Sequence, residues 1–250
     1  MPESSESSEQ RIAELEAQLA ALRAEMQEFT YTVSHDLRAP LRHIVAYAQL
    51  VQEDAAEQLS TEVQGFLATI SDSARHMGML LDGLTTLSRL GVAPVTLVSV
   101  PLQPLVQEVC AELQAQAGQR SLQWRIAADL PLVRADAALL RQALLHVLGN
   151  AVKFTAPRPQ ALVDMTFARD AATNLVTLEI ADNGVGYNPA LQDKLFKVFS
   201  RLHSSKAFEG LGLGLALTHK IMQRLDGSVQ ASGVLDGGCR VTLRLPAGVG

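Results

Sequence analysis

Residues 34–41 read SHDLRAPL, and this stretch lies within a long segment whose apolar side chains follow a heptad pattern. Upstream of it, apolar residues recur at alternating steps of three and four, at Ile12, Leu15, Leu19, Leu22, Met26, Phe29 and Val33. This a/d spacing is typical of a coiled coil. The next two steps, to Leu37 and to Leu41, are both of four residues, and such a stutter locally unwinds a supercoil. The pattern therefore predicts a long paired helix that carries His35 at an irregular point.

A second amphipathic segment follows a break at residues 54–61 and covers residues 61–90. Its apolar residues repeat at helical spacing, at Val63, Leu67, Ile70, Ala74, Met77, Leu81 and Leu84. Two such helices form an antiparallel hairpin, and one chain cannot bury so long an apolar stripe. We therefore expect a homodimer whose two hairpins form a four-helix bundle. Pro40 should bend the first helix, because it removes the hydrogen bond to the carbonyl of Asp36.

The pattern changes after a short linker at residues 91–94, and alternating strands and helices follow. Strands are expected at 95–100, 121–126, 161–168, 175–181, 228–232 and 239–245, and helices at 101–117, 136–154 and 211–225, with Asp136 as the N-cap of the second of these helices. The fold class is therefore α+β. We expect a helical dimerisation domain in residues 10–90 and an α/β sandwich domain in residues 95–250. Residues 1–9 are rich in Ser and Glu and are expected to be disordered.

The composition favours a soluble protein and argues against several other classes. The 250 residues are 48% hydrophobic and carry a net charge of −5, which argues against nucleic acid as a partner. Cys110 and Cys239 lack the spacing of zinc ligands. The N-terminus has no signal-peptide pattern, and no apolar run is long enough to cross a bilayer. We expect a cytoplasmic protein without membrane insertion.

Two glycine-rich motifs in the second half favour a nucleotide site. DNGVG (182–186) directly follows an apolar strand, and the carboxylate of Asp182 can accept a hydrogen bond from an exocyclic amine such as that of adenine. GLGLGL (210–215) precedes a helix, whose free N–H groups and dipole attract phosphate. The glycines let the backbone approach a ligand closely. Each motif alone could equally be a packing turn.

A polar face on an otherwise apolar helix adds a third signal. His146 and Asn150 lie four residues apart, so they share one face, and both side chains can ligate a divalent cation held by phosphates. Lys153 follows three residues later and can contact a phosphate as a point charge. The alternative for Asn150 is an amide that is satisfied within the core.

Taken together, five motifs resemble those of two-component sensor histidine kinases over residues 27–245. The H box is SHDLRAPL (34–41), the N box LHVLGNAVKFT (145–155), the G1 box DNGVG (182–186), the F box LFKVF (195–199) and the G2 box GLGLGL (210–215). The sequences of residues 31–44 and 201–215 are most similar to those of kinase modules attached to bacterial phytochromes. The resemblance implies a helical dimerisation domain followed by a Bergerat-type ATP-binding sandwich.

The resemblance also implies the roles of individual residues. His35 is the phosphoacceptor, Asp36 orients it, and residues 201–209 form a lid over ATP. ATP and Mg²⁺ are the expected cofactors, with Asn150 and His146 at the metal. The expected nucleotide-binding residues are Asn150, Lys153, Asp182, Gly184, Gly186, Phe199, Gly210, Gly212, Leu213 and Gly214. Arg38 could steady the transferring phosphoryl group or an acidic pocket of a partner, and a solvated helix face is the alternative.

The predicted function is autophosphorylation of a histidine by ATP, followed by transfer of the phosphoryl group to an aspartate of a response-regulator receiver domain. An upstream sensor protein would supply the signal. Two alternatives remain. One is an ATPase of the chaperone and gyrase kind, which would not need the hairpin with its His-Asp pair. The other is a non-catalytic ATP-binding dimerising scaffold.

Overall fold

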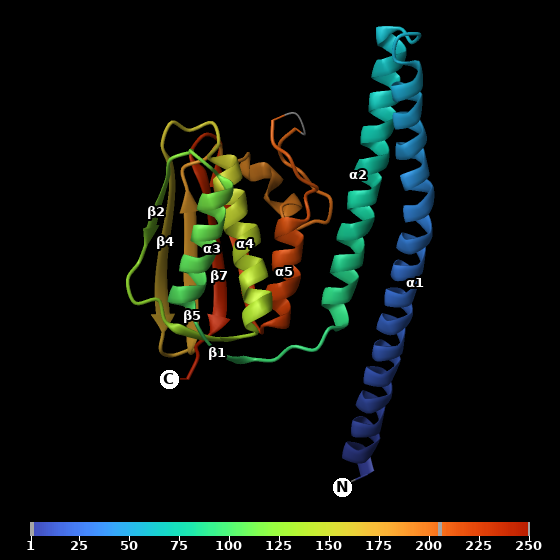
Figure 1. Cartoon of the computed structure of the whole chain (residues 1–250). Coiled ribbons are helices and arrows are strands. Elements are labelled where there is room, and N and C mark those ends of the chain that lie inside the picture. The colour runs from blue at the N-terminus through green and yellow to red at the C-terminus, as the bar shows by residue number, and fades with distance from the viewer. Residues whose placement is uncertain (1–2, 205–206, 250) are drawn as a thin grey trace. The chain divides into compact units, whose positions relative to one another are not determined.

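The computed structural model describes residues 3–204 and 207–249, and it divides into two compact units, one up to Ala93 and one from Pro94 onward. The first unit is a pair of long helices, and the second is a sheet covered by helices (Figure 1). The domain bounds expected from the sequence were 10–90 and 95–250. The expected linker at residues 91–94 differs, because the second helix continues through Gly91 to Val92.

The first unit consists of α1 (Glu3–Ala55) and α2 (Thr61–Val92). Ser60 caps α2, since its side chain accepts a hydrogen bond from the N–H of Val63 at 3.3 Å. Helix α1 continues through Pro40. It also begins at Glu3, within the segment expected to be disordered, because its Ser and Glu residues are compatible with a helix that the heptads already support. Residues 1–2 lie outside the described part of the chain.

The two helices of one hairpin meet mainly through small side chains. Ala48 and Ala74 are buried, as are Ser34 and Ser71. Most large apolar residues of the predicted seam are exposed, at Ile12, Leu15, Leu19, Leu22, Met26, Phe29, Leu37, Val63, Ile70, Met77 and Leu84, and so are Ile44 and Val51 further along α1. Val33, Leu41, Leu67 and Leu81 are partly buried. An exposed apolar stripe of this length indicates that another surface covers it.

The second unit contains seven strands, three α-helices and a 3₁₀-helix among its described residues. In chain order these are β1 (Val98–Pro101), α3 (Leu102–Gln116), β2 (Leu122–Ile126), β3 (Leu132–Ala135), α4 (Ala137–Phe154), β4 (Ala161–Asp170), β5 (Leu175–Asp182), η1 (Pro189–Lys194), α5 (Gly214–Arg224), β6 (Ser228–Val234) and β7 (Gly238–Pro246). Strand β3 was not predicted, because it is short and its sequence does not alternate. Helix α5 starts at Gly214 and not at Leu211, since residues 210–212 form an irregular glycine-rich segment.

Five strands form a mixed sheet in the order β2-β4-β5-β7-β6, in which only β2 and β4 are parallel. Strands β1 and β3 pair separately as an antiparallel ribbon. Helices α3, α4 and α5 lie over one face of the sheet (Figure 1). Residues of β4 and β5 alternate between buried and less buried, as expected when one face of a sheet is covered. The result is a two-layer α/β sandwich, as the sequence predicted.

Aliphatic side chains fill the space between the helices and the sheet. Leu140, Leu144 and Leu148 of α4 are fully buried, one turn apart along a single face. Each stabilises the fold by about 1.5–3 kcal/mol relative to an exposed position. Asp136 caps α4, as predicted, because its Oδ1 accepts hydrogen bonds from the N–H groups of residues 138 and 139, both at 3.1 Å. The buried face of α4 thereby fixes which residues form its opposite, polar face.

Candidate functional site

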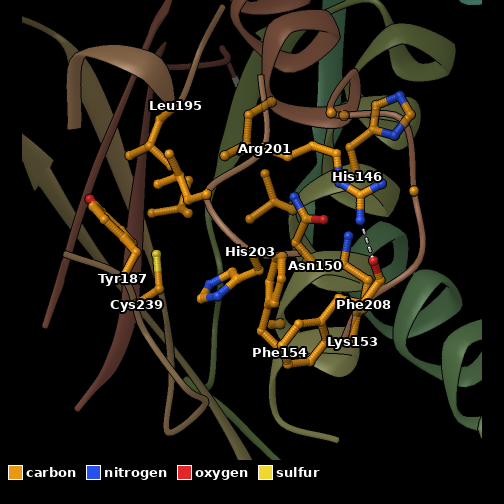
Figure 2. A pocket seen from close by; sticks show the side chains of 18 of the residues that line it. His146, Asn150, Lys153, Phe154, Tyr187, Leu195, Arg201, His203, Phe208 and Cys239 are labelled. Carbon is orange, nitrogen blue, oxygen red and sulfur yellow. Dashed lines mark hydrogen bonds between the residues drawn. The ribbon is translucent and has the colours of Figure 1, made fainter. Parts of the chain in front are cut away.

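A cavity of about 410 Å³ lies within the second unit, against the C-terminal half of α4 and the end of β5. The rest of its lining comes from β7, from the start of α5 and from residues 186–187, 195, 200–203 and 208–213. Figure 2 shows Tyr187 and Cys239 on one side of the cavity, and Lys153, Arg201 and His146 on the other. A thiol and a phenol thus lie at one end of the cavity, and basic side chains lie at the other.

Asp182 is one of two acids that line this cavity, the other being Glu209. Its Oδ1 accepts hydrogen bonds from the N–H of Gly184 at 2.8 Å and from the N–H of Cys239 at 3.2 Å. Burial raises the pKa of Asp182 to about 6, although these two hydrogen bonds lower it. Both bonds use the same oxygen, so Oδ2 is available to accept a hydrogen bond from a ligand. Burial also raises the pKa of the Cys239 thiol to about 12, so that group stays neutral beside the carboxylate.

The polar face of α4 brings His146, Asn150 and Lys153 to the cavity, as their spacing predicted. Nε2 of His146 is buried and has no hydrogen-bond partner among the described residues. Burial lowers the pKa of His146, so the imidazole is neutral near pH 7, and a neutral ring nitrogen can accept a hydrogen bond or ligate a cation. Burial and the charge of Arg201 lower the pKa of Lys153. An unpartnered nitrogen and two neighbouring cations fit a ligand that carries negative charge.

Residues 201–203 and 208 form another part of the cavity lining. Nη2 of Arg201 donates to the carbonyl of Phe208 at 2.5 Å, and this bond is drawn in Figure 2. Phe154, His203 and Phe208 form an aromatic trio with ring centroids 5.0–5.3 Å apart. Nζ of Lys153 lies 4.4 Å from the centroid of the Phe154 ring, a cation–π contact. These contacts join Arg201 and the aromatic trio to the cationic end of the cavity.

Glycines at the cavity permit backbone contacts that a side chain would block. A Cβ at Gly212, where φ is +71°, would lie 2.4 Å from the carbonyl oxygen of Ser200. A Cβ at Gly186, where φ is +57°, would lie 1.8 Å from the carbonyl oxygen of Val234. Gly214 forms the first residue of α5 and lies close to His146 and Asn150. The N-terminus of α5 therefore faces the polar side of α4, a geometry that suits phosphate.

Eight of the ten predicted nucleotide-binding residues line this one cavity: Asn150, Lys153, Asp182, Gly186, Gly210, Gly212, Leu213 and Gly214. The predicted metal ligand His146 lines it too. Two others do not line it. Gly184 supports Asp182 through its N–H, and a Cβ there would lie 2.7 Å from the carbonyl oxygen of Phe154. Phe199 is 40% exposed and adopts φ of +61°. It lies in a turn whose backbone at residues 199–200 packs against Gly212. Phe199 therefore lies in a turn, and its contact with a nucleotide stays a prediction.

The sequence reasoning did not single out Arg201, His203 or Phe208 as individual binding residues, although it expected a lid at residues 201–209. The F box ends two residues before Arg201, and a basic residue in that place was the signal available. The aromatic trio had no sequence signal, because its three rings come from two separate segments.

The first unit presents His35 on α1. The His35 side chain is 68% exposed, so its ring is accessible from solvent. Its Nδ1 lies 3.1 Å from Oδ1 of Asp36, which favours the tautomer with the proton on Nδ1 and an unprotonated Nε2. The Tyr31 ring stacks beside that of His35, with centroids 6.4 Å apart. This arrangement leaves a nucleophilic nitrogen directed away from the carboxylate.

Arg38 lies on the same helix and pairs with the other one. Its Nη2 donates to Oδ1 of Asp82 on α2 at 2.8 Å. Both side chains are substantially exposed, so the pair contributes about 0–1 kcal/mol to stability. Arg38 therefore links the two helices of the hairpin, and a role toward the phosphoryl group or a partner stays a prediction.

The described residues contain no cluster of three or more His, Cys, Asp or Glu side chains that could hold a metal ion by themselves. Within the same part of the chain, no helix combines the length and the apolar character that a membrane span requires.

Comparison with known families assigns both units. Residues 25–92 match the model of the His Kinase A (phospho-acceptor) domain. Residues 135–249 match the model described as histidine kinase-, DNA gyrase B-, and HSP90-like ATPase. A phosphoacceptor hairpin followed by an ATPase domain of this class defines the protein class. The chain belongs to the two-component sensor histidine kinases.

Curated relatives extend beyond this chain. It is 25% identical over 238 residues to cyanobacterial phytochrome A of Nostoc, which covers 95% of the chain and 30% of that protein. It is 29% identical over 245 residues to the circadian input-output histidine kinase CikA of Synechococcus elongatus, covering 95% of the chain and 32% of the relative. The chain thus spans about a third of the length of these relatives.

Solved structures agree with the fold. A crystal structure of full-length ShkA in complex with AMPPNP matches with a TM-score of 0.62 and 27% identity, over 89% of this chain and 46% of that one. The Acinetobacter baumannii histidine kinase AdeS matches with a TM-score of 0.56 and 21% identity, over 85% of this chain and 98% of that one. The domain match and the nucleotide complex of the first neighbour support ATP binding by this fold.

Proposed function

We propose that this chain transfers the γ-phosphoryl group of ATP to His35 and then to an aspartate of a response-regulator receiver domain. The observation that carries the proposal is the exposed imidazole of His35, which Asp36 holds by a hydrogen bond. The same chain contains a cavity lined by Asp182 and by the cationic side chains of Lys153 and Arg201. These are the nucleophile and the nucleotide pocket that the reaction needs.

His35 acts as the nucleophile in this proposal. Because Asp36 accepts the hydrogen bond of Nδ1–H, the lone pair of Nε2 is available and directed away from the carboxylate. Nε2 bonds to the γ-phosphorus while the bond from that phosphorus to the β,γ-bridging oxygen breaks, and ADP leaves with the electron pair. Asp36 stabilises the positive charge that develops on the ring. Positioning and neutralisation of charge supply most of the catalysis in such transfers.

The cavity residues bind and orient ATP. Asp182 accepts a hydrogen bond from the adenine amine through Oδ2, while Lys153 and Arg201 face the phosphates. The N-terminus of α5 adds backbone N–H donors to this end. Asn150 and His146 would hold Mg²⁺ against the phosphates, and the ion would neutralise charge on the leaving group. The unpartnered Nε2 of His146 and the adjacent Asn150 amide fit that ion.

We further propose that the chain acts as a homodimer. The exposed seam of α1 and α2 supports this, because pairing two hairpins would bury it in a four-helix bundle. The coiled-coil spacing of residues 12–33 continues that seam toward the N-terminus. An upstream sensor protein or segment would act on this end.

The two alternatives predict different products. A chaperone-like or gyrase-like ATPase would release phosphate without labelling the protein, and a non-catalytic scaffold would bind ATP without consuming it. No observation favours either, since neither requires an exposed imidazole that is paired with a carboxylate.

The test is incubation with γ-labelled ATP and Mg²⁺ of the wild type, His35→Gln and His43→Gln. His43 is a matched control, an exposed histidine eight residues further along the same helix. We expect an acid-labile label on the wild type and on His43→Gln, and none on His35→Gln. Label on His35→Gln, or on none of the three proteins, would contradict the proposal.

A further inference from the structure

Arg158 lies in the turn between α4 and β4, outside all five sequence motifs. Its guanidinium donates three hydrogen bonds to main-chain carbonyls. Nε donates to Asn183 at 2.9 Å, and Nη2 donates to Gly184 and to Asp236, both at 2.8 Å. Nη2 also lies 3.7 Å from Oδ1 of Asp236. A side chain that is only 29% exposed therefore uses its donors on backbone from two different turns.

Both turns adjoin the nucleotide cavity, since Asp182 and Gly186 of one turn line it, as does Cys239, which directly follows the other. One is the turn at residues 182–186, and the other joins β6 to β7 at residues 234–238. They contact each other directly, because the N–H of Asp236 donates to the carbonyl of Val185 at 2.7 Å. A Cβ at Gly238 would lie 1.9 Å from the carbonyl oxygen of Asp182. Backbone packed this closely has little freedom to shift while Arg158 joins both turns.

Among the described residues, the N–H groups that donate to the Asp182 carboxylate come from the first turn and from the residue that follows the second. Gly184, whose carbonyl accepts from Arg158, donates to Oδ1 of Asp182. Cys239, which follows the second turn, donates to the same oxygen. Arg158 therefore acts on the residues that decide which oxygen of Asp182 is free and where it points.

We propose that Arg158 is a positioning residue for nucleotide recognition, since its guanidinium fixes the two turns that aim Asp182 at the base. This inference rests on the proposed function, in which Asp182 accepts a hydrogen bond from the adenine amine. Arginine suits this role because its rigid planar fork donates in several directions at once, which a lysine ammonium on a flexible chain does not reproduce.

The test measures recognition of the amine as well as affinity. Binding of ATP and of purine riboside triphosphate, which lacks the exocyclic amine, is compared in the wild type, Arg158→Met, Arg158→Lys and the control Arg141→Met. Arg141 is the matched control because it pairs with Glu108 and Glu112 on α3, in the same unit but in neither turn. Steady-state phosphorylation of the chain gives KM for ATP and kcat separately, and thermal melting checks that each variant is folded.

We expect the wild type and Arg141→Met to prefer ATP by roughly tenfold or more, because a site built to pair an amine rejects the analogue without it. Arg158→Met should raise KM for ATP about tenfold and reduce the preference to less than about threefold, with kcat at saturation nearly unchanged. Arg158→Lys should give an intermediate preference. It also provides the same readout if Arg158→Met does not fold.

The possible results distinguish the positioning role of Arg158 from the recognition of adenine by Asp182. If the wild type binds both nucleotides equally, Asp182 does not read the amine, and the adenine assignment in the proposed function fails together with this inference. If the wild type discriminates and both Arg158 variants keep its full preference, or lose affinity equally for both nucleotides, the positioning role is wrong while the proposed function stands.

Discussion

Replacing Asp182 with Asn should weaken ATP binding and at the same time stabilise the protein. In the variant, Oδ1 of the Asn can still accept the hydrogen bonds that the N–H groups of Gly184 and Cys239 donate to Oδ1 of Asp182 in the wild type. Its NH₂ group must then occupy the position of Oδ2, where it meets the amine of adenine donor to donor. Loss of a hydrogen bond to a charged acceptor corresponds to about 1.5–3 kcal/mol, or about 10–150-fold in affinity.

The stability effect follows from the pKa of Asp182, which burial raises from 3.8 to about 6. A carboxyl whose folded pKa is raised binds more protons in the folded state, so its contribution to stability falls as pH rises from about 4 to about 6. At pH 7 the ionised group costs up to about 3 kcal/mol relative to a neutral one. Asn carries no charge, so Asp182→Asn should recover part of this free energy above pH 6 and almost none near pH 4.

The assay is thermal or urea unfolding of both full-length proteins between pH 4 and pH 8, beside nucleotide binding over the same range. Contributions of other groups cancel in the difference between the two proteins. The difference in stability should grow as pH rises, whereas wild-type affinity for ATP should fall as pH drops below about 6, because a protonated Oδ2 no longer accepts. A variant that is less stable than the wild type at pH 7, or that binds ATP as well, would refute this account of Asp182.

Two further changes test the glycine-rich segment and the exposed seam. Gly212→Ala places a Cβ 2.4 Å from the carbonyl oxygen of Ser200 at φ of +71°, and should cost about 1–3 kcal/mol and weaken ATP binding; calorimetry would show this, and unchanged binding would contradict it. Leu22→Glu combined with Phe29→Glu places charges on two seam residues that are each 63% exposed in the single chain. The double variant should be a monomer where the wild type is a dimer, and light scattering would measure the difference in mass. A double variant that remains dimeric would place the interface elsewhere.

The sequence by itself determined the helical hairpin, the order of the elements apart from β3, and the candidate residues that share one face of α4. Heptad spacing located α1 and α2, because a buried stripe must repeat with the helical period. Alternation located β4 and β5, and the side chain of Asp136 identified the start of α4. The four-residue spacing of His146 and Asn150 placed both on one face, and the structure brings that face to the cavity. Each of these features is local along the chain.

Only the tertiary structure decided how distant segments meet. Arg158 has no motif, and its importance appears only once the turns at residues 182–186 and 234–238 lie beside it. The raised pKa of Asp182 likewise depends on burial by residues far away in sequence, and the position of Phe199 outside the cavity lining depends on the turn that packs against Gly212. Local periodicity reports which face of an element is apolar, whereas hydrogen bonds and desolvation between separate segments depend on the packing of the folded chain.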